Sequence, residues 1–121
     1  MKKYYILAVV FVLALFIAIY LETSKTSDIS GQENIIFFYG KECPHCQIVE
    51  EYIEKSGIDQ KVEFTRAEIY HNKNNQKIFI EKNKSCGIND EKKMGVPFLW
   101  ADGKCMSGQD NVIEYFQNKV K

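Results

Sequence analysis

The chain has 121 residues, of which 45% are hydrophobic and 26% are charged, with 16 basic and 16 acidic side chains. This composition is typical of a globular protein and excludes a largely disordered chain. Two of the basic residues are Lys2 and Lys3, so residues 22–121 carry 14 basic and 16 acidic side chains, a net charge of −2. Such a balance offers no basic surface for phosphates, and we expect no nucleic-acid partner. The length suits one domain and excludes a multi-domain enzyme.

The first feature in chain order is a run of 18 uncharged residues, from Tyr4 to Leu21. A helix crosses the hydrocarbon core of a bilayer in about 20 residues. The core of a cleaved signal peptide is usually shorter, about 7–15 residues, and ends in a small-x-small cleavage site, which the sequence at residues 18–21 lacks. We therefore predict a membrane anchor over residues 1–21, with membrane contact through residues 4–21, and keep a cleaved signal as the alternative.

The charges beside this run predict its orientation. Two lysines precede it, and the positive-inside rule then places the N-terminus in the cytoplasm. We therefore expect a single-pass membrane protein whose domain is extracytoplasmic. Residues 22–33 are polar and lack periodicity, which predicts a short linker. The remaining residues, 34–121, form the predicted domain.

The first half of this domain predicts a strand, a helix, a second strand and a second helix. The continuous apolar run at residues 35–39 is typical of a strand that is buried on both faces. A helix follows from Pro44, with Cys43 as its N-cap, and ends at Ser56-Gly57. The alternation within residues 61–69 predicts a half-buried strand. A second helix is expected over residues 72–83, with Gly87 as the cap residue after it.

The second half predicts a hairpin and a last helix. A polar loop over residues 89–95 leads to a strand at residues 97–101, and Asp102-Gly103 is a strong signal for a two-residue hairpin turn. Residues 104–106 pair back, and Ser107-x-x-Asp110 is interpreted as a capping box that opens the last helix. The order is β-α-β-α-β-β-α, with the first two strands parallel. We expect an α/β fold with a four-stranded mixed sheet and helices on both faces.

The motif that carries chemistry is Cys43-Pro44-His45-Cys46. A C-x-x-C pair has three interpretations: a redox dithiol, half of a zinc site, or a plain structural bridge. Its position after a buried strand and at the start of a helix favours the redox dithiol. Free backbone N–H groups and the helix dipole stabilise a thiolate there, and the sequence has no second C-x-x-C to complete a zinc site. We therefore predict no bound metal.

Each residue of the motif has an expected role. Cys43, at the N-cap, is expected to be exposed and to attack first, because the thiolate is the nucleophile of disulfide exchange. Cys46, one turn later, is expected to be more buried and to resolve the mixed disulfide. Pro44 stiffens the turn. His45 supplies a donor or a positive charge near the Cys43 sulfur, which would favour the reduced form and make the disulfide more oxidising.

The order of these elements, with C-P-H-C followed much later by Val96-Pro97 before a strand, resembles the thioredoxin superfamily over about residues 34–120. The resemblance implies that Pro97 is cis and faces the dithiol, and that the Val96 backbone pairs with an incoming substrate strand. A proline that merely enters a strand is the alternative. Lys41, just before the motif, is a further candidate for substrate binding, with an ordinary loop charge as its alternative.

Within that superfamily the chain is most similar to the glutaredoxins, because the fold is minimal and Gly95-Val96-Pro97-Phe98-Leu99 precedes a Gly-containing turn at residues 107–110. In glutaredoxins such a turn and its acidic residue hold glutathione, which would then be a co-substrate. Two departures stand out: Ser107 replaces the usual glycine, and Pro44-His45 resembles the periplasmic disulfide oxidases of the DsbA type. This chain has no room for the large helical insertion of those oxidases.

The other two cysteines, Cys86 and Cys105, lie near the sheet edge in the fold that the resemblance implies. We hypothesise a second disulfide between them, either structural or able to relay electrons to the dithiol. Two separate buried thiols and a four-cysteine metal site are the alternatives. His71, among polar neighbours, is interpreted as a solvated residue.

The sequence thus predicts a membrane-tethered thiol–disulfide oxidoreductase that needs no metal or organic cofactor. Its partners would be cysteine-containing proteins and a redox partner in or near the membrane. A glutathione-dependent reductase of the glutaredoxin type is one alternative. A thioredoxin-like module that binds a metal or a client without turnover is the other.

Overall fold

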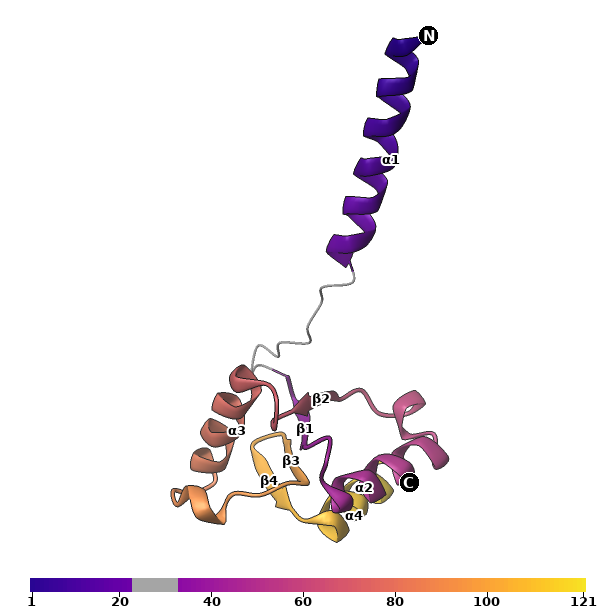
Figure 1. Cartoon of the computed structure of the whole chain (residues 1–121). Coiled ribbons are helices and arrows are strands. Elements are labelled where there is room, and N and C mark those ends of the chain that lie inside the picture. The colour runs from indigo at the N-terminus through magenta and orange to yellow at the C-terminus, as the bar shows by residue number, and fades with distance from the viewer. Residues whose placement is uncertain (23–32) are drawn as a thin grey trace.

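The structure, a computed structural model, describes residues 1–22 and 33–121. The linker predicted over residues 22–33 lies almost wholly outside the described residues. Helix α1 (Lys2–Glu22) covers the N-terminal apolar run (Figure 1). Within the described part of the chain, α1 is the one helix that is long and apolar enough to cross a membrane, and its length and composition suit an anchor or a signal sequence.

A four-stranded mixed sheet forms the centre of the domain, as predicted. Its strands are β1 (Ile35–Tyr39), β2 (Thr65–Glu68), β3 (Phe98–Ala101) and β4 (Lys104–Ser107), in the spatial order β2-β1-β3-β4. Strand β1 is parallel to β2 and antiparallel to β3, and β3 is antiparallel to β4. The carboxyl end of β1 therefore lies beside the start of β3, which brings the two halves of the predicted site together.

Helices cover both faces of this sheet (Figure 1). Helices α2 (Pro44–Lys55) and α4 (Gln109–Lys119) lie on one face, and α3 (Lys73–Ser85) lies on the other. Short 3₁₀ turns, η1 (Ile58–Gln60) and η2 (Glu91–Lys93), complete the domain. The alternation of side chains along a strand explains why β1 is apolar throughout, since successive residues enter the two cores in turn.

The two cores are built mainly from aliphatic and aromatic side chains. The core under α2 and α4 buries Ile35, Phe37, Val49, Ile53, Ile58, Val62, Leu99, Ala101, Val112 and Phe116. The core under α3 buries Ile36, Phe38, Ala67, Ile69, Phe79 and Phe98. Each face of β1 thus anchors one helix layer, and the strand that leads into the C-P-H-C motif is held from both sides.

The hairpin prediction is confirmed. Asp102 and Gly103 both have positive φ, +51° and +81°, as a two-residue turn of type I′ requires. The turn sets the register of β3 and β4, in which Phe98 pairs with Ser107 and Trp100 with Cys105.

The strand predicted over residues 61–69 is shorter than expected, because only Thr65–Glu68 joins the ladder. Lys61 is the C-cap of η1, and the Val62 N–H donates to the Ile58 carbonyl within that turn. Val62 and Phe64 do contact the core under α2 and α4, but as parts of the connection that precedes the strand. The alternation of apolar residues at these positions reflects contact with the core and not a strand. The strand prediction for Val62 and Phe64 is therefore wrong.

The capping box predicted at Ser107 and Asp110 is also wrong. Ser107 is the last residue of β4 and pairs with Phe98, so it is not available as an N-cap. Gly108 occupies the N-cap of α4 with φ +89° and makes no side-chain cap bond. The helix predicted over residues 72–83 runs from Lys73 to Ser85, with Asn72 as its N-cap and Gly87 at φ +82° after its end.

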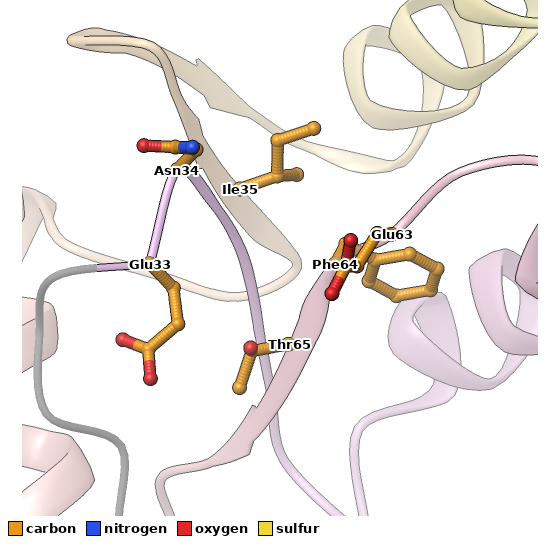
Figure 2. A pocket seen from close by; sticks show the side chains of 6 residues that line it. All are labelled: Glu33, Asn34, Ile35, Glu63, Phe64 and Thr65. Carbon is orange, nitrogen blue, oxygen red and sulfur yellow. The ribbon is translucent and has the colours of Figure 1, made fainter.

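A hollow of about 250 Å³ lies where β1 and β2 begin (Figure 2). Because these strands are parallel, this end of the sheet is opposite the end that leads to Cys43. Its lining residues are Glu33, Asn34, Ile35, Glu63, Phe64 and Thr65. None of the cysteines lies here, so the chemistry belongs to the other end of the sheet.

Candidate active site

The dithiol sits where β1 passes into α2. Cys43 is the N-cap of α2, in extended conformation, and Pro44 takes the first helical position, as predicted. The Cys43 N–H donates to the Gly40 carbonyl at 3.1 Å, which closes the turn between strand and helix. The Cys46 N–H donates to Cys43 Sγ at 3.2 Å. The sulfur thus takes the place that a serine or aspartate oxygen occupies in an ordinary N-cap.

Cys43 and Cys46 form a disulfide, with their Cα atoms 5.2 Å apart. Cys46 is 1% exposed, as expected for the resolving cysteine, but Cys43 is only 6% exposed. The expectation of an exposed Cys43 is therefore wrong for this oxidised form. Its sulfur is turned back under the helix toward Cys46, and the carbonyl oxygen of Val96 lies 3.7 Å from it.

The loop before β3 carries the second half of the site. The Val96–Pro97 peptide bond is cis, as the resemblance implied, and Pro97 is buried. The Pro97 carbonyl accepts a hydrogen bond of 2.9 Å from the Gly108 N–H. This bond ties the loop to the start of α4, while the pairing of Phe98 with Phe38 holds it beside the carboxyl end of β1.

A groove of about 560 Å³ lies between the first turn of α2, the loop before β3 and the start of α4. His45, which is exposed, lies at its border, and His45 Nδ1 is 3.1 Å from Gln109 Oε1. The sequence placed a His45 donor near the Cys43 sulfur. In the structure the N–H that reaches that sulfur belongs to the Cys46 backbone, and the His45 ring is bonded to α4 instead. The remaining lining residues are Val96, Pro97, Ser107, Gly108, Asp110 and Asn111.

This geometry favours a thiolate on Cys43 in the reduced protein. The first backbone N–H groups of a helix lack partners within the helix and point toward its N-cap, where the dipole is positive. A thiolate at that position accepts these bonds, which lowers the pKa of a cysteine well below about 8.5. The arrangement can therefore hold a nucleophile and a leaving group at one sulfur.

The sequence analysis missed the contacts of three side chains that tie the motif to the rest of the domain, although His71 is exposed, as predicted. His71 Nε2 contacts the Glu42 carboxylate at 2.8 Å, just before Cys43. The Glu68 carboxylate accepts backbone N–H bonds from Lys41, Tyr70 and His71, at 3.3, 2.9 and 2.8 Å. No local pattern predicts the Lys41–Glu68 and Glu42–His71 contacts, because the paired residues are 27 and 29 positions apart. The bonds of Glu68 to the N–H groups of Tyr70 and His71 are local, over two and three residues.

Glu68 is the central residue of this group. Burial by itself raises the pKa of Glu68, but the backbone N–H donors of His71, Tyr70 and Lys41 lower it more, so the pKa lies below its ordinary value. Potential metal-ligating atoms of Glu42, Glu68 and His71 lie within 4.8 Å of one another. Since Glu68 is committed to backbone donors and Glu42 to His71, the group acts as a clamp between the dithiol loop and the end of β2.

Lys41, the sequence candidate for substrate binding, is exposed beside this clamp. It borders a cavity of about 370 Å³ together with Tyr39, Arg66 and Asn75. Arg66 is bonded to Asp59 at 2.7 and 3.1 Å. Lys41 is two residues before Cys43 in the sequence, and among the described residues no side-chain contact joins its ammonium to Cys43.

The second disulfide, Cys86–Cys105, is present with its Cα atoms 6.3 Å apart, as hypothesised. The alternatives of separate thiols and of a four-cysteine metal site do not hold, because all four cysteines of the chain are bridged in two pairs. Cys86 is the C-cap of α3, and Cys105 lies in the edge strand β4. This bridge pins α3 to the sheet two residues along β4 from Ser107.

Comparison with solved structures identifies the class of fold. The domain is similar to a buckwheat glutaredoxin in complex with glutathione, with a TM-score of 0.51 and 18% identity over 74% of each chain. It is similar to oxidised glutaredoxin 2 from Chlamydomonas reinhardtii, with a TM-score of 0.50 and 18% identity over 74% of this chain and 77% of that one. Glutaredoxin C1 from Populus tremula x tremuloides, in its holo form, gives a TM-score of 0.50 and 18% identity, over 75% and 81%.

No protein-family profile matches the chain, and no curated protein matches it. At this level of identity the solved structures show the fold alone. The domain therefore has a glutaredoxin-like α/β fold of the thioredoxin type, with a C-x-x-C pair at its dithiol position and a long apolar helix before it.

Proposed function

We propose that this protein is a membrane-tethered thiol–disulfide oxidoreductase that exchanges its Cys43–Cys46 pair with cysteines of other proteins outside the cytoplasm. The observation that carries the proposal is the placement of Cys43. Its sulfur sits at the N-cap of α2, accepts the Cys46 N–H, and lies 3.7 Å from the Val96 carbonyl beside a cis proline. One sulfur thus lies both at the start of a helix and beside the backbone of Val96.

The exchange has two steps. A substrate thiolate attacks Cys43 Sγ, the Cys43–Cys46 bond breaks, a mixed disulfide forms, and Cys46 leaves as a thiolate. A second substrate thiolate attacks the substrate sulfur of that mixed disulfide and releases Cys43 as a thiolate. The substrate loses two electrons and two protons, and the Cys43–Cys46 pair gains them. A redox partner in or near the membrane would restore the pair, and reduction of a substrate runs the same steps in reverse.

Val96 is proposed to hold the substrate during these steps. Within the described residues, no backbone hydrogen bond involves its N–H or its carbonyl, since the loop is fixed instead through Pro97 and Phe98. An extended substrate segment can therefore pair with Val96, as a strand is added to a free edge. Such pairing would place the substrate cysteine beside Cys43.

The second disulfide supports the extracytoplasmic location. Disulfides persist in oxidising compartments and are rare in the cytosol. The Cys86–Cys105 bridge joins α3 to β4, away from the N-cap geometry that makes a disulfide exchange readily. Together with the two lysines before α1, it favours a domain outside the cytoplasm and an N-terminus within it.

A glutathione-dependent reductase is the second candidate. The groove at the start of α4, with Gly108 and Asp110 on its wall, corresponds to the region that holds glutathione in glutaredoxins, and one similar structure is a glutathione complex. Ser107 in place of the usual glycine weighs against close approach of such a ligand. A rate of exchange with proteins that does not depend on added glutathione would favour the first candidate.

The test is a trapping experiment with the full chain in its membrane. Cys46→Ala leaves a mixed disulfide on Cys43 without its resolving thiol, so covalent complexes with protein partners should accumulate and disappear on reduction. Cys43→Ala/Cys46→Ala, which has no nucleophile at the site, is the matched control. If Cys46→Ala captures no partner and the wild-type chain binds a metal through its reduced dithiol, the domain is a binding module and the proposal is wrong.

A further inference from the structure

The charged residues of the domain are divided unequally between its two helix layers. Helices α2 and α4 lie on one face of the sheet, and α3 with the turn η2 lies on the other (Figure 1). Residues 44–63 and 109–121, which form the α2–α4 layer, hold seven acidic and four basic side chains, a net charge of −3. Residues 73–93, which form the α3 layer, hold six lysines and three acidic side chains, a net charge of +3.

The lysines of α3 point away from the core. Lys73, Lys77 and Lys84 are exposed, and their spacing of four and seven residues places them on one side of the helix, together with Glu81. The buried side chains of α3 occupy the opposite side. In the described part of the chain none of these three lysines forms an ion pair. Their ammonium groups are therefore available to an anionic partner, and η2 adds two further exposed lysines.

The net charge of the sequence conceals this separation. The sequence analysis expected no basic surface because acidic residues slightly outnumber basic ones after the N-terminal run. That expectation does not hold for the α3 layer, since folding gathers lysines on one face and carboxylates on the other. A body whose two faces carry opposite charge is oriented by the field of a charged surface.

We propose that the α3 layer docks on the anionic headgroups of the membrane that holds α1. The inference rests on the membrane tether of the proposed function. Anionic lipids attract the exposed lysines of α3 and repel the carboxylates of the α2–α4 layer, so both charges favour one orientation. Because the anchor keeps the domain beside the bilayer, docking is an intramolecular step. A modest charge then suffices, even if it would not bind a membrane from solution.

Docking in this orientation determines how the dithiol is presented. Helix α2 lies on the face of the sheet that is opposite to α3, and Cys43 is its N-cap. The docked domain therefore keeps the start of α2 off the lipid and open to proteins in the surrounding solution.

Trp100 reports docking, because it is the only tryptophan of the chain and packs in the α3 layer, where Lys82 Nζ lies 3.9 Å from its ring centroid. The full chain is placed in nanodiscs in which some lipid headgroups carry a nitroxide, which quenches the fluorescence of a nearby tryptophan. We expect stronger quenching in anionic than in zwitterionic nanodiscs. The difference should vanish at about 1 M salt, where the screening length is only about 3 Å. Equal quenching in the two lipids would overturn the inference.

The lysines of α3 test the docking face. Each lysine near an anionic surface strengthens the attraction by about fivefold, so Lys73→Gln/Lys77→Gln/Lys84→Gln should lower the ratio of docked to undocked domain by about a hundredfold. Quenching of Trp100 in anionic nanodiscs should then fall to its value in zwitterionic ones. Quenching that stays at the wild-type value would overturn the inference.

The matched control removes three lysines from the other layer. Lys55→Gln/Lys61→Gln/Lys119→Gln changes the net charge by the same amount, but at the face that is turned away from the lipid, and should keep the wild-type quenching. Equal losses in the two variants would show that only net charge matters and would overturn the docking face.

The failure of docking and the failure of the proposed function are distinguishable. None of the six lysines lines the groove beside α4 or the cavity beside Lys41, so each variant should exchange thiols with a small soluble disulfide at the wild-type rate. A full chain that does not insert into nanodiscs, or that exchanges no thiols, would overturn the proposed function. A tethered and active chain whose quenching ignores the lipid charge would leave the proposed function intact and overturn the docking.

Discussion

The two disulfides of this small domain lie in opposite settings. Cys43–Cys46 spans three residues at the start of a helix, where backbone N–H groups and a cis-proline loop surround one sulfur. Cys86–Cys105 spans 19 residues and joins the end of α3 to an edge strand. The Cys43–Cys46 bond closes a loop of only a few residues, but it lies where a thiolate is stabilised. The second restrains a long loop and has no such donor arrangement, so its setting suits stability.

The sharpest test of this comparison is to disrupt each bridge in turn. Cys43→Ser should abolish exchange, by at least about a thousandfold, because a serine hydroxyl is not ionised at neutral pH and cannot form a mixed disulfide. Cys86→Ala/Cys105→Ala should keep most of the wild-type rate, measured in the same insulin-reduction or thiol-exchange assay. Loss of exchange in the second variant at a temperature where it is folded would show that the second pair relays electrons.

The second expected effect is on stability. Closing a loop of this length lowers the entropy of the unfolded chain, so Cys86→Ala/Cys105→Ala should reduce the free energy of unfolding by about 3 kcal/mol. Chemical denaturation of the full chain in detergent, monitored by Trp100 fluorescence, gives the value. Cys43→Ala/Cys46→Ala, which opens a much smaller loop, should cost less, and the reverse order would contradict the division of roles.

The turn that carries the dithiol is sensitive to bulk. A Cβ at Gly40 would overlap the ring of Tyr70, which is 47% exposed and can swing aside. Gly40→Ala should therefore destabilise the domain by about 1 kcal/mol, at the low end for overpacking. Gly95→Ala, where nothing lies within 4 Å of an added Cβ, is the control and should be neutral. If Gly40→Ala and Gly95→Ala lowered the free energy of unfolding equally, the overlap with Tyr70 would not explain the effect at Gly40.

The smallest effect is pH-dependent and comes from Glu68. Its pKa is lowered on folding, since the backbone donors outweigh burial. The stabilisation is therefore present above the ordinary pKa of about 4.5 and is lost as the pH falls through the folded value. Glu68→Gln should cost about 1 kcal/mol at pH 7, and urea titrations at pH 7 and pH 3 should show the difference from wild type shrink. A constant difference would contradict the pKa shift.

Much of the dithiol's local setting could be predicted from the sequence because its signals are local. Pro44 suits only the first turn of a helix, so Cys43 had to be the N-cap, and the apolar run before it had to be a buried strand. The turn at Asp102-Gly103 follows from the positive φ that both residues accept. In each case one or two residues determine the local backbone conformation, and no tertiary contact is needed to predict it.

The sequence predictions fail for residues whose environment is set by segments that are distant in the sequence. Ser107 looks like an N-cap in isolation, but its pairing with Phe98 keeps it in β4. The Val96 carbonyl, which lies 3.7 Å from the Cys43 sulfur, belongs to a residue 53 positions away. The contact of His71 with Glu42 likewise depends on β1 and β2 being neighbours. Each is a consequence of sheet order, which a local pattern does not encode.

The position of β1 also has a mechanical consequence. The strand begins two residues after the first described residue beyond the linker and ends four residues before Cys43, with β2 on one side and β3 on the other. A force between the linker and a partner bound at Cys43 therefore runs along β1. Such a force acts along the strand, roughly at right angles to the hydrogen bonds that join β1 to β2 and to β3, and it loads all of these bonds together. A force at right angles to the strand would instead break them one after another. Under the proposed function, a pull between a membrane anchor and a substrate bound at Cys43 would therefore be shared by the hydrogen bonds of both ladders.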